Sequence, residues 1–163
     1  MANKAARIII LLLTGVLLFA FSASADITTC GTVAESDRLT ANVVATTAGD
    51  CLRVTANGVQ IDCNGFSITY DIFGQGNSSA INITQRLNTN VTNCLIFKGN
   101  SSATYTGIYS AGINVTESNF TNIRNVTFNV SGTANAGTHY GVSLNNNTIN
   151  TTIYNNTFYM GGA

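Results

Sequence analysis

Short stretches in which apolar and polar residues alternate follow one another along most of this chain. After residue 25, no window carries apolar residues at helical spacing for three turns, and the abundant Thr, Val, Ile and Asn residues favour strands and turns. Links rich in Gly, Asn and Ser separate the stretches, for example "GQGNSS" at Gly74 and "SGTANAG" at Ser131. The pattern predicts an all-β chain of short strands.

Three of these stretches form a repeat, because they align without gaps. They are "TNVTNCLIF" from Thr89, "TNIRNVTFN" from Thr121 and "TTIYNNTFY" from Thr151, which start 32 and 30 residues apart. The recurring columns are apolar at Val91, Ile123 and Ile153, amide at Asn93, Asn125 and Asn155, and apolar again at Ile96, Phe128 and Phe158. Strand-and-turn repeats of about 20–50 residues indicate a solenoid.

A second short strand is predicted before each copy, and a looser copy precedes the first. The second strands are "CLRV" at Cys51, "AINI" at Ala80, "GIYS" at Gly107 and "GVSL" at Gly141. The looser copy is "ANGVQIDCNGFSI" from Ala56, with Ile61 in the column of Val91. Each unit is therefore expected to hold a short strand, a turn, a longer strand and a polar link.

The stacking of like residues distinguishes two possible arrangements of these strands. An antiparallel sandwich also gives short alternating strands, but it does not require the same residue at the same place in every copy. A parallel coil requires the same residue at the same place in every copy, because its successive rungs lie about 4.8 Å apart and equivalent residues stack on one another. We therefore expect a parallel solenoid of about four rungs, with the three asparagines forming an amide ladder at a corner and the Ile96 column filling the interior.

The chain resembles the right-handed parallel β-helix proteins of the pectin-lyase-like superfamily. "NVTNCLI", "NVTFNVS" and "NNTFYM" are similar to the repeats of secreted members, NosD-type proteins included, and "VQIDCNGFSI" resembles a phrase near their N-terminal caps. The resemblance covers roughly Asp26 to the C-terminus and implies a right-handed parallel β-helix. It implies no single activity, because the superfamily contains lyases, hydrolases, adhesins and structural proteins.

The N-terminal segment, residues 1–25, is predicted to be a signal peptide with a signal helix. Lys4 and Arg7 precede an apolar run from Ile8 to Phe21, and Ala23-Ser24-Ala25 fits a cleavage site. The alternative is an uncleaved membrane anchor, although the run is shorter than the roughly 20 residues that a spanning helix needs.

The remaining chain is predicted to be one domain. Residues 26–50 are expected to cap the solenoid, and residues 51–163 to form its repeats. The chain stops at "FYMGGA", directly after a rung strand, so the repeats or another domain are expected to continue beyond Ala163.

The charge and the cysteine spacing of the chain do not suggest nucleic acid or metal as a partner. Without residues 1–25, five basic residues face seven acidic ones, a formal charge of −2, and no basic stripe is present, so no nucleic-acid partner is predicted. No C-x-x-C pair or Cys/His cluster suggests a metal, and no cofactor is predicted.

Four cysteines in an exported chain suggest disulfides with three possible connectivities. They are Cys30, Cys51, Cys63 and Cys94. The pairing of Cys30 with Cys51 is favoured because these two flank a single short segment. Cys63 and Cys94 form either a second pair or two small buried thiols.

The acidic residues give no sign of a catalytic pair, and no catalytic residue is predicted. The two carboxylates of a glycosidase lie roughly 5–10 Å apart, which adjacent rungs would provide only if acids occurred one repeat apart. Asp62 instead aligns with Thr92, Arg124 and Tyr154. The simplest interpretation of Arg124 is a solvated outward side chain, and that of His139 is a loop histidine.

Tyrosine and asparagine at outward positions suit carbohydrate recognition, because they combine apolar contact with hydrogen bonds. The candidate glycan-binding residues are Tyr105, Tyr109, Tyr140, Tyr154 and Tyr159. The alternative is that Tyr is simply a good strand residue. Among many N-x-S/T sequons, Asn77 and Asn100 are the N-glycosylation candidates because they lie in links.

The sequence therefore suggests an exported extracellular or cell-surface module, structural or adhesive, that binds polysaccharide or surface glycans. One alternative is the N-terminal part of a polysaccharide lyase or glycoside hydrolase whose catalytic rungs lie beyond residue 163. A second alternative is a NosD-type periplasmic accessory protein. A membrane is expected as a partner only through an uncleaved signal.

Overall fold

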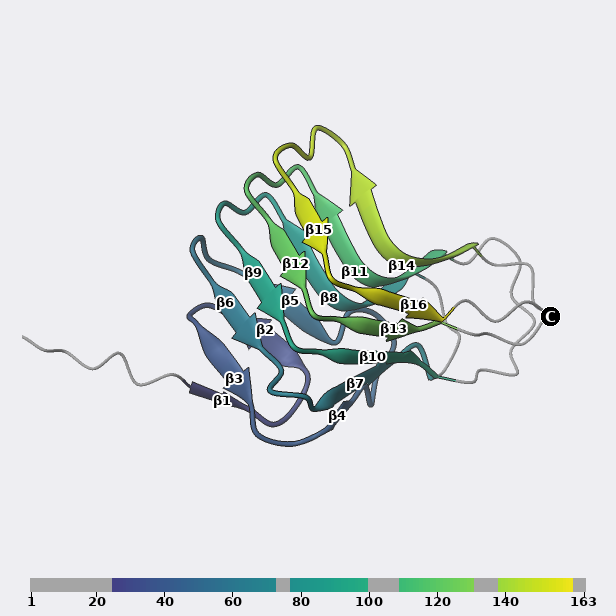
Figure 1. The fold of residues 1–163 in the computed structure, drawn as a ribbon. Helices are drawn as coiled ribbons and strands as arrows, with labels where there is room; N and C mark the ends of the chain where they lie inside the picture. The colour runs from purple at the N-terminus through teal and green to yellow at the C-terminus, as the bar shows by residue number, and fades with distance from the viewer. Residues whose placement is uncertain (1–24, 73–76, 100–108, 131–137, 160–163) are drawn as a thin grey trace, which may run out of the picture.

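The computed structural model describes residues 25–72, 77–99, 109–130 and 138–159, and all regular elements among them are β-strands (Figure 1). The strands form three parallel sheets that wind into a solenoid. Sheet A contains, in spatial order, β1 (Ala25–Ile27), β3 (Asp37–Leu39), β6 (Gln60–Asp62), β9 (Asn90–Thr92), β12 (Asn122–Arg124) and β15 (Thr152–Tyr154). Sheet B contains β2 (Gly31–Val33), β5 (Leu52–Val54), β8 (Ser78–Thr84), β11 (Tyr109–Thr116) and β14 (Thr138–Asn145). Sheet C contains β4 (Val43–Val44), β7 (Ser67–Tyr70), β10 (Leu95–Lys98), β13 (Thr127–Asn129) and β16 (Thr157–Tyr159).

The parallel register places like residues on like residues. In sheet A, Ile61 pairs with Val91, Val91 with Ile123, and Ile123 with Ile153. In sheet C the corresponding column is Ile68, Ile96, Phe128 and Phe158. Most members of these columns are fully buried, so the core is a set of stacked apolar columns. The predicted all-β parallel solenoid is confirmed, and an antiparallel sandwich is excluded.

The longer strand that the sequence predicted in each copy is in fact two strands at an angle. In the first copy these are β9 and β10, and Asn93 lies between them with a φ of 57°. Asn125 and Asn155 occupy the same corner with φ values of 54° and 53°. This left-handed conformation ends a strand, and Asn adopts it more readily than most residues.

The corner asparagines also bond to one another along the solenoid. Asn155 Nδ2 donates to Asn125 Oδ1 at 2.6 Å, and Asn125 Nδ2 donates to Asn93 Oδ1 at 3.2 Å. Asn93 Nδ2 in turn donates to Asp62 Oδ1 at 2.9 Å. The three amides therefore form a ladder that ends on a carboxylate.

The strands of sheet B follow a register that differs from the sequence-based alignment. Ile81 pairs with Ile113, and Ile113 with Val142, so the counterpart of "AINI" is "GINV" at Gly112. The sequence pattern instead predicts "GIYS" at Gly107, which lies five residues too early. Both segments present a small residue followed by an apolar one, and only the 32-residue spacing from Ala80 to Gly112 separates them.

Small residues in sheet B make room for large residues in sheet C. A Cβ atom on Gly112 would lie 2.7 Å from Phe128 Cδ1, and one on Gly141 would lie 2.5 Å from Phe158 Cδ1. The preceding coil combines Ala80 with the smaller Ile96 at the equivalent positions. The two phenyl rings stack with centroids 4.8 Å apart. The coils thus fill the same interior space either with Ala and Ile or with Gly and Phe.

Two disulfides link successive coils at the N-terminal side. Cys30 is bonded to Cys51 and Cys63 to Cys94, with Cα–Cα distances of 4.6 and 4.7 Å. The segment predicted as a cap, residues 26–50, contributes β2, β3 and β4, which pair in parallel with β5, β6 and β7. The predicted signal segment lies outside the described residues apart from Ala25.

The Gly112→Ala variant tests the fit between sheets B and C. We expect it to lower the free energy of unfolding by about 1–3 kcal/mol, because the methyl group overlaps Phe128 and the Gly141 carbonyl. The second change Phe128→Ile, which restores the Ala80–Ile96 combination, should recover part of the loss. Gly31→Ala is the control, because a Cβ there meets nothing within 4 Å. Equal stability of the two alanine variants in urea titrations would contradict this packing.

Phe120 has an unfavourable backbone conformation and should be replaceable with a gain in stability. Its φ is 57° and its side chain is 51% exposed, whereas Asn88 and Asn150 hold similar φ values one coil away on either side. The left-handed region costs a bulky residue about 1–2 kcal/mol. We expect Phe120→Asn to raise the free energy of unfolding by roughly 1 kcal/mol. A decrease measured by urea unfolding would show that Phe120 makes a favourable contact that outweighs the strain.

Candidate functional site

The outer face of sheet A carries a groove lined with polar side chains. Because side chains alternate along each strand, the residues on either side of the buried Ile61 column point outward. One outward column holds Gln60, Asn90, Asn122 and Thr152, and the other holds Asp62, Thr92, Arg124 and Tyr154. A groove of about 410 Å³ runs over these strands, lined by Gln60, Asp62, Asn90, Thr92, Asn93, Asn122, Arg124 and Tyr154.

Hydrogen bonds fix several of the lining side chains. Asn122 Nδ2 donates to Asn90 Oδ1 at 2.9 Å, which extends amides from one coil to the next. Arg124 Nη1 lies 3.5 Å from Tyr154 Oη, and both side chains are exposed. The groove therefore offers amide donors and acceptors along its length, with a guanidinium and an aromatic ring at its C-terminal end.

Asp62 lies at the other end of this groove and stays ionised near neutral pH. Burial raises the pKa of its carboxyl group, but bonds from the Asn93 side chain and the Asn64 backbone, with the charge of Arg38, outweigh burial and lower the pKa. Asn64 N donates to Asp62 Oδ1 at 2.9 Å. Among the described residues that line the groove, Asp62 is the only acid, so these residues do not form the carboxylate pair of a glycosidase.

The predicted tyrosines do not converge on one site. Tyr154 lines the groove of sheet A, and Tyr159 lies on sheet C with 59% of its surface exposed. Tyr109 and Tyr140 lie on sheet B, with ring centroids 5.5 Å apart. Tyr105 lies outside the described residues. Among the predicted tyrosines that the structure describes, Tyr154 alone lines the sheet A groove, whereas Tyr109 and Tyr140 lie on sheet B and Tyr159 lies on sheet C.

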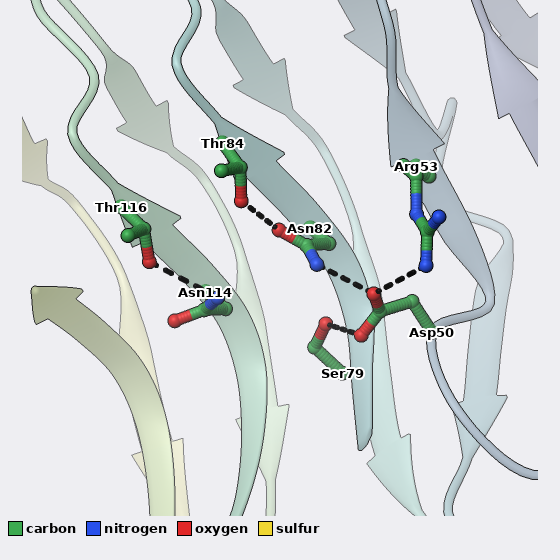
Figure 2. Close-up of polar contacts among 7 residues, drawn as sticks. All are labelled: Asp50, Arg53, Ser79, Asn82, Thr84, Asn114 and Thr116. Atoms are coloured by element: carbon green, nitrogen blue, oxygen red, sulfur yellow. Dashed lines mark hydrogen bonds and ion pairs between the residues drawn. The ribbon is translucent and has the colours of Figure 1, made fainter. Parts of the chain in front are cut away.

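The outer face of sheet B carries a polar network that the sequence analysis missed. The Asp50 carboxylate accepts hydrogen bonds from Ser79 Oγ and Asn82 Nδ2, and its Oδ2 lies 3.5 Å from Arg53 Nη2 (Figure 2). Asn82 also accepts a hydrogen bond from Thr84. In the next coil, Asn114 donates a hydrogen bond to Thr116 of the same strand. The recurring Asn-x-Thr motif was the available signal. Because Asp50 is shielded and its oxygens are bonded, we assign the network a structural role.

A second polar cluster lies inside the solenoid, between the ends of sheets C and B. Lys98 Nζ and Asp71 Oδ2 are 3.5 Å apart, with side chains only 5% and 2% exposed. Ser110 Oγ lies 2.6 Å from His139 Nδ1. Sequence reasoning missed this contact, because the misplaced "GIYS" alignment hid that Ser110 pairs with His139 in adjacent strands. Ser110 is fully buried, so its hydroxyl is not accessible to an outside substrate.

Two ionisable groups of the cluster have shifted pKa values. Burial lowers the pKa of His139, and the positive charge of Lys98 lowers it further, although Asp71 opposes the shift. Burial and the charge of Asp71 raise the pKa of the enclosed Tyr70 hydroxyl. Both groups are therefore held in their uncharged forms near neutral pH.

Other candidate features have the following positions. Asn77 is exposed, and Asn100 lies outside the described residues. Within the described ranges, no group of three or more His, Cys, Asp or Glu side chains gathers as metal ligands do. In the same part of the chain, no helix has the length and apolar character needed to cross a membrane.

Comparison with protein-family models, curated proteins and solved structures finds no match for this chain.

The lowered pKa of His139 predicts a pH dependence of stability. The unfolded chain takes up a proton near pH 6.5 and the folded chain only at lower pH, so the stabilising contribution is present above about 6.5 and is lost as pH falls through the folded value. We expect the urea midpoint to decrease between pH 7.5 and 5. Asp62 contributes little to the change in stability between pH 7.5 and 5, because its ordinary pKa is 3.8.

His139→Gln is the matched variant, since the glutamine oxygen can still accept a bond from Ser110 but the side chain does not titrate. Its urea midpoint should vary less than that of the original chain between pH 7.5 and 5. Parallel curves for the two proteins would show that protonation of His139 does not determine this dependence.

Proposed function

We propose that this chain is an exported β-helix module of the pectin-lyase-like type, NosD-type proteins included, that binds polysaccharide in the groove of sheet A. The observation that carries the proposal is the groove itself. Its volume of about 410 Å³ lies within the range of ligand sites in proteins. Its lining is polar with one aromatic ring, a combination suited to sugars, which present hydroxyl groups and apolar ring faces.

The repeat gives the groove a periodic lining. Gln60, Asn90 and Asn122 belong to consecutive strands about 4.8 Å apart, so equivalent amides recur along the solenoid axis. A polymer lying along that axis would meet a similar set of donors and acceptors at each step. This periodicity favours an extended glycan chain over a single small sugar.

The chemistry of the groove favours binding over catalysis. Asp62 accepts hydrogen bonds from Asn93 and the Asn64 backbone, and the described residues of the lining include no second carboxylate. An acid–base pair for glycoside hydrolysis is therefore missing from this groove. The two disulfides are compatible with an oxidising environment, which supports an extracellular or cell-surface location.

The Tyr154→Ala variant tests the proposed binding groove. A glycan array with the original chain first identifies the polysaccharide, and titration calorimetry then compares variants. We expect Tyr154→Ala to weaken binding by roughly tenfold, because it removes the aromatic surface of the groove. Tyr159→Ala is the control, since Tyr159 is also exposed, at 59% against 48% for Tyr154, but lies on sheet C. Silence across the array, or an equal loss in both variants, would refute binding in this groove.

A further inference from the structure

Lys98 and Asp71 form an enclosed ion pair between two successive coils. Lys98 Nζ lies 3.5 Å from Asp71 Oδ2, and the two side chains are only 5% and 2% exposed. Lys98 ends β10 and pairs with Tyr70, which ends β7, so Asp71 is the first residue after its strand. Enclosing two charges costs free energy that their attraction does not always repay. The pair is therefore a reactive arrangement as well as a structural contact, because an amine and a carboxyl group are held together away from water.

The surrounding backbone keeps the two side chains in one place. Gly99 N donates a hydrogen bond to Tyr70 O at 2.6 Å, directly beside the pair. Ile72 packs so closely against Gly99 that a Cβ atom on this glycine would overlap it. The Cys63–Cys94 disulfide joins the same two coils before β7 and β10 begin. The two charged side chains are therefore neighbours whenever the chain is folded.

We propose that Lys98 and Asp71 condense to an isopeptide bond, an amide between their side chains that links the two coils covalently. Lys98 Nζ forms a bond to Asp71 Cγ, and one carboxylate oxygen leaves as water with two protons of the ammonium group. The atoms balance without an oxidant or a reductant. Because Cγ is one bond from Oδ2, a small side-chain rotation brings the reacting atoms to the roughly 3–3.5 Å of a near-attack geometry. The product is uncharged, which removes the cost of enclosing two charges.

Two protons must move from nitrogen to oxygen, and the enclosed cluster contains a group that can carry the second. The ammonium group faces the carboxylate and passes the first proton to it directly. Burial lowers the pKa of His139, Lys98 lowers it further and Asp71 opposes the shift, so the imidazole is uncharged and within electrostatic range of both groups. An uncharged imidazole can take a proton from the attacking nitrogen and return it to the leaving oxygen. The contact of His139 Nδ1 with Ser110 Oγ, at 2.6 Å, holds the ring in place.

Intact mass and cleavage by a lysine-specific protease test this bond in the original chain. The chain contains two lysines, Lys4 and Lys98, so Lys98 is the single cleavage site after residue 4. We expect the folded chain to lose the mass of one water and, once denatured and reduced, to resist cleavage between Lys98 and Gly99. All four cysteines precede Lys98, so no disulfide can hold the two fragments of a cleaved chain together. The same chain purified in urea without refolding should keep its full mass and be cleaved completely.

Two variants separate the bond from the ion pair. Lys98→Arg keeps a positive charge beside Asp71, but a guanidinium group does not condense, so this variant should retain its full mass. His139→Gln can still accept a bond from Ser110 and should form the link roughly tenfold more slowly, because its side chain cannot carry a proton. Circular dichroism checks that both variants keep their strands. Equal rates in the original chain and His139→Gln would overturn the role of His139.

The mass spectra also distinguish the bond from other outcomes. A branched peptide that joins Lys98 to Asp71 in the tandem mass spectrum would establish the link. A folded chain that keeps its full mass and is cut after Lys98, even after a week of incubation, would overturn the proposal and leave a stable ion pair. Loss of one water with normal cleavage after Lys98 would also overturn it, because that result indicates a succinimide at an aspartate instead.

Discussion

Each coil of this solenoid must offer its backbone N–H and C=O groups to the coils on either side, and this requirement forces successive coils to follow the same path. The described strand pairs are all parallel, so equivalent residues lie about 4.8 Å apart along the axis. The buried column of Ile61, Val91 and Ile123 is one consequence. The outward amides of the sheet A groove are another, because a residue that points outward in one coil points outward in the next.

The corners satisfy this constraint through residues that adopt left-handed backbone conformations. Asn93, Asn125 and Asn155 turn the chain between sheets A and C, and their side chains bond to one another in a ladder. Each asparagine thus contributes twice, through its tolerance of positive φ and through its amide. Interior packing allows more variation, since Ala80 with Ile96 and Gly112 with Phe128 fill equivalent space in different ways.

The fold was largely predictable from the sequence, because parallel register in a solenoid requires similar residues at equivalent positions of successive repeats. The corner positions followed from the recurring asparagine, but the sharp bend between two strands did not. Asn90 and Asn122 also recur and lie within strands, so a recurring asparagine alone does not predict a left-handed backbone. The "GIYS" error arose where a small residue followed by an apolar one occurs twice within seven residues. The groove was harder to predict: Tyr154 was a candidate, but its separation from Tyr109 and Tyr159 depends on which sheet each strand joins. The Ser110–His139 contact depends on the same assignment.

Parallel stacking of the coils fixes the distances between residues of one column, and these distances can be measured with spin labels. Arg38, Asp62, Thr92, Arg124 and Tyr154 form one outward column, although Arg38 and Tyr154 are 116 residues apart in sequence. Pulsed electron spin resonance between labels at Arg38 and Tyr154 should give a separation of about 19 Å, four strand spacings, and about 14 Å when the second label is at Arg124. A separation beyond about 30 Å, or one that does not increase from Arg124 to Tyr154, would contradict the parallel stack.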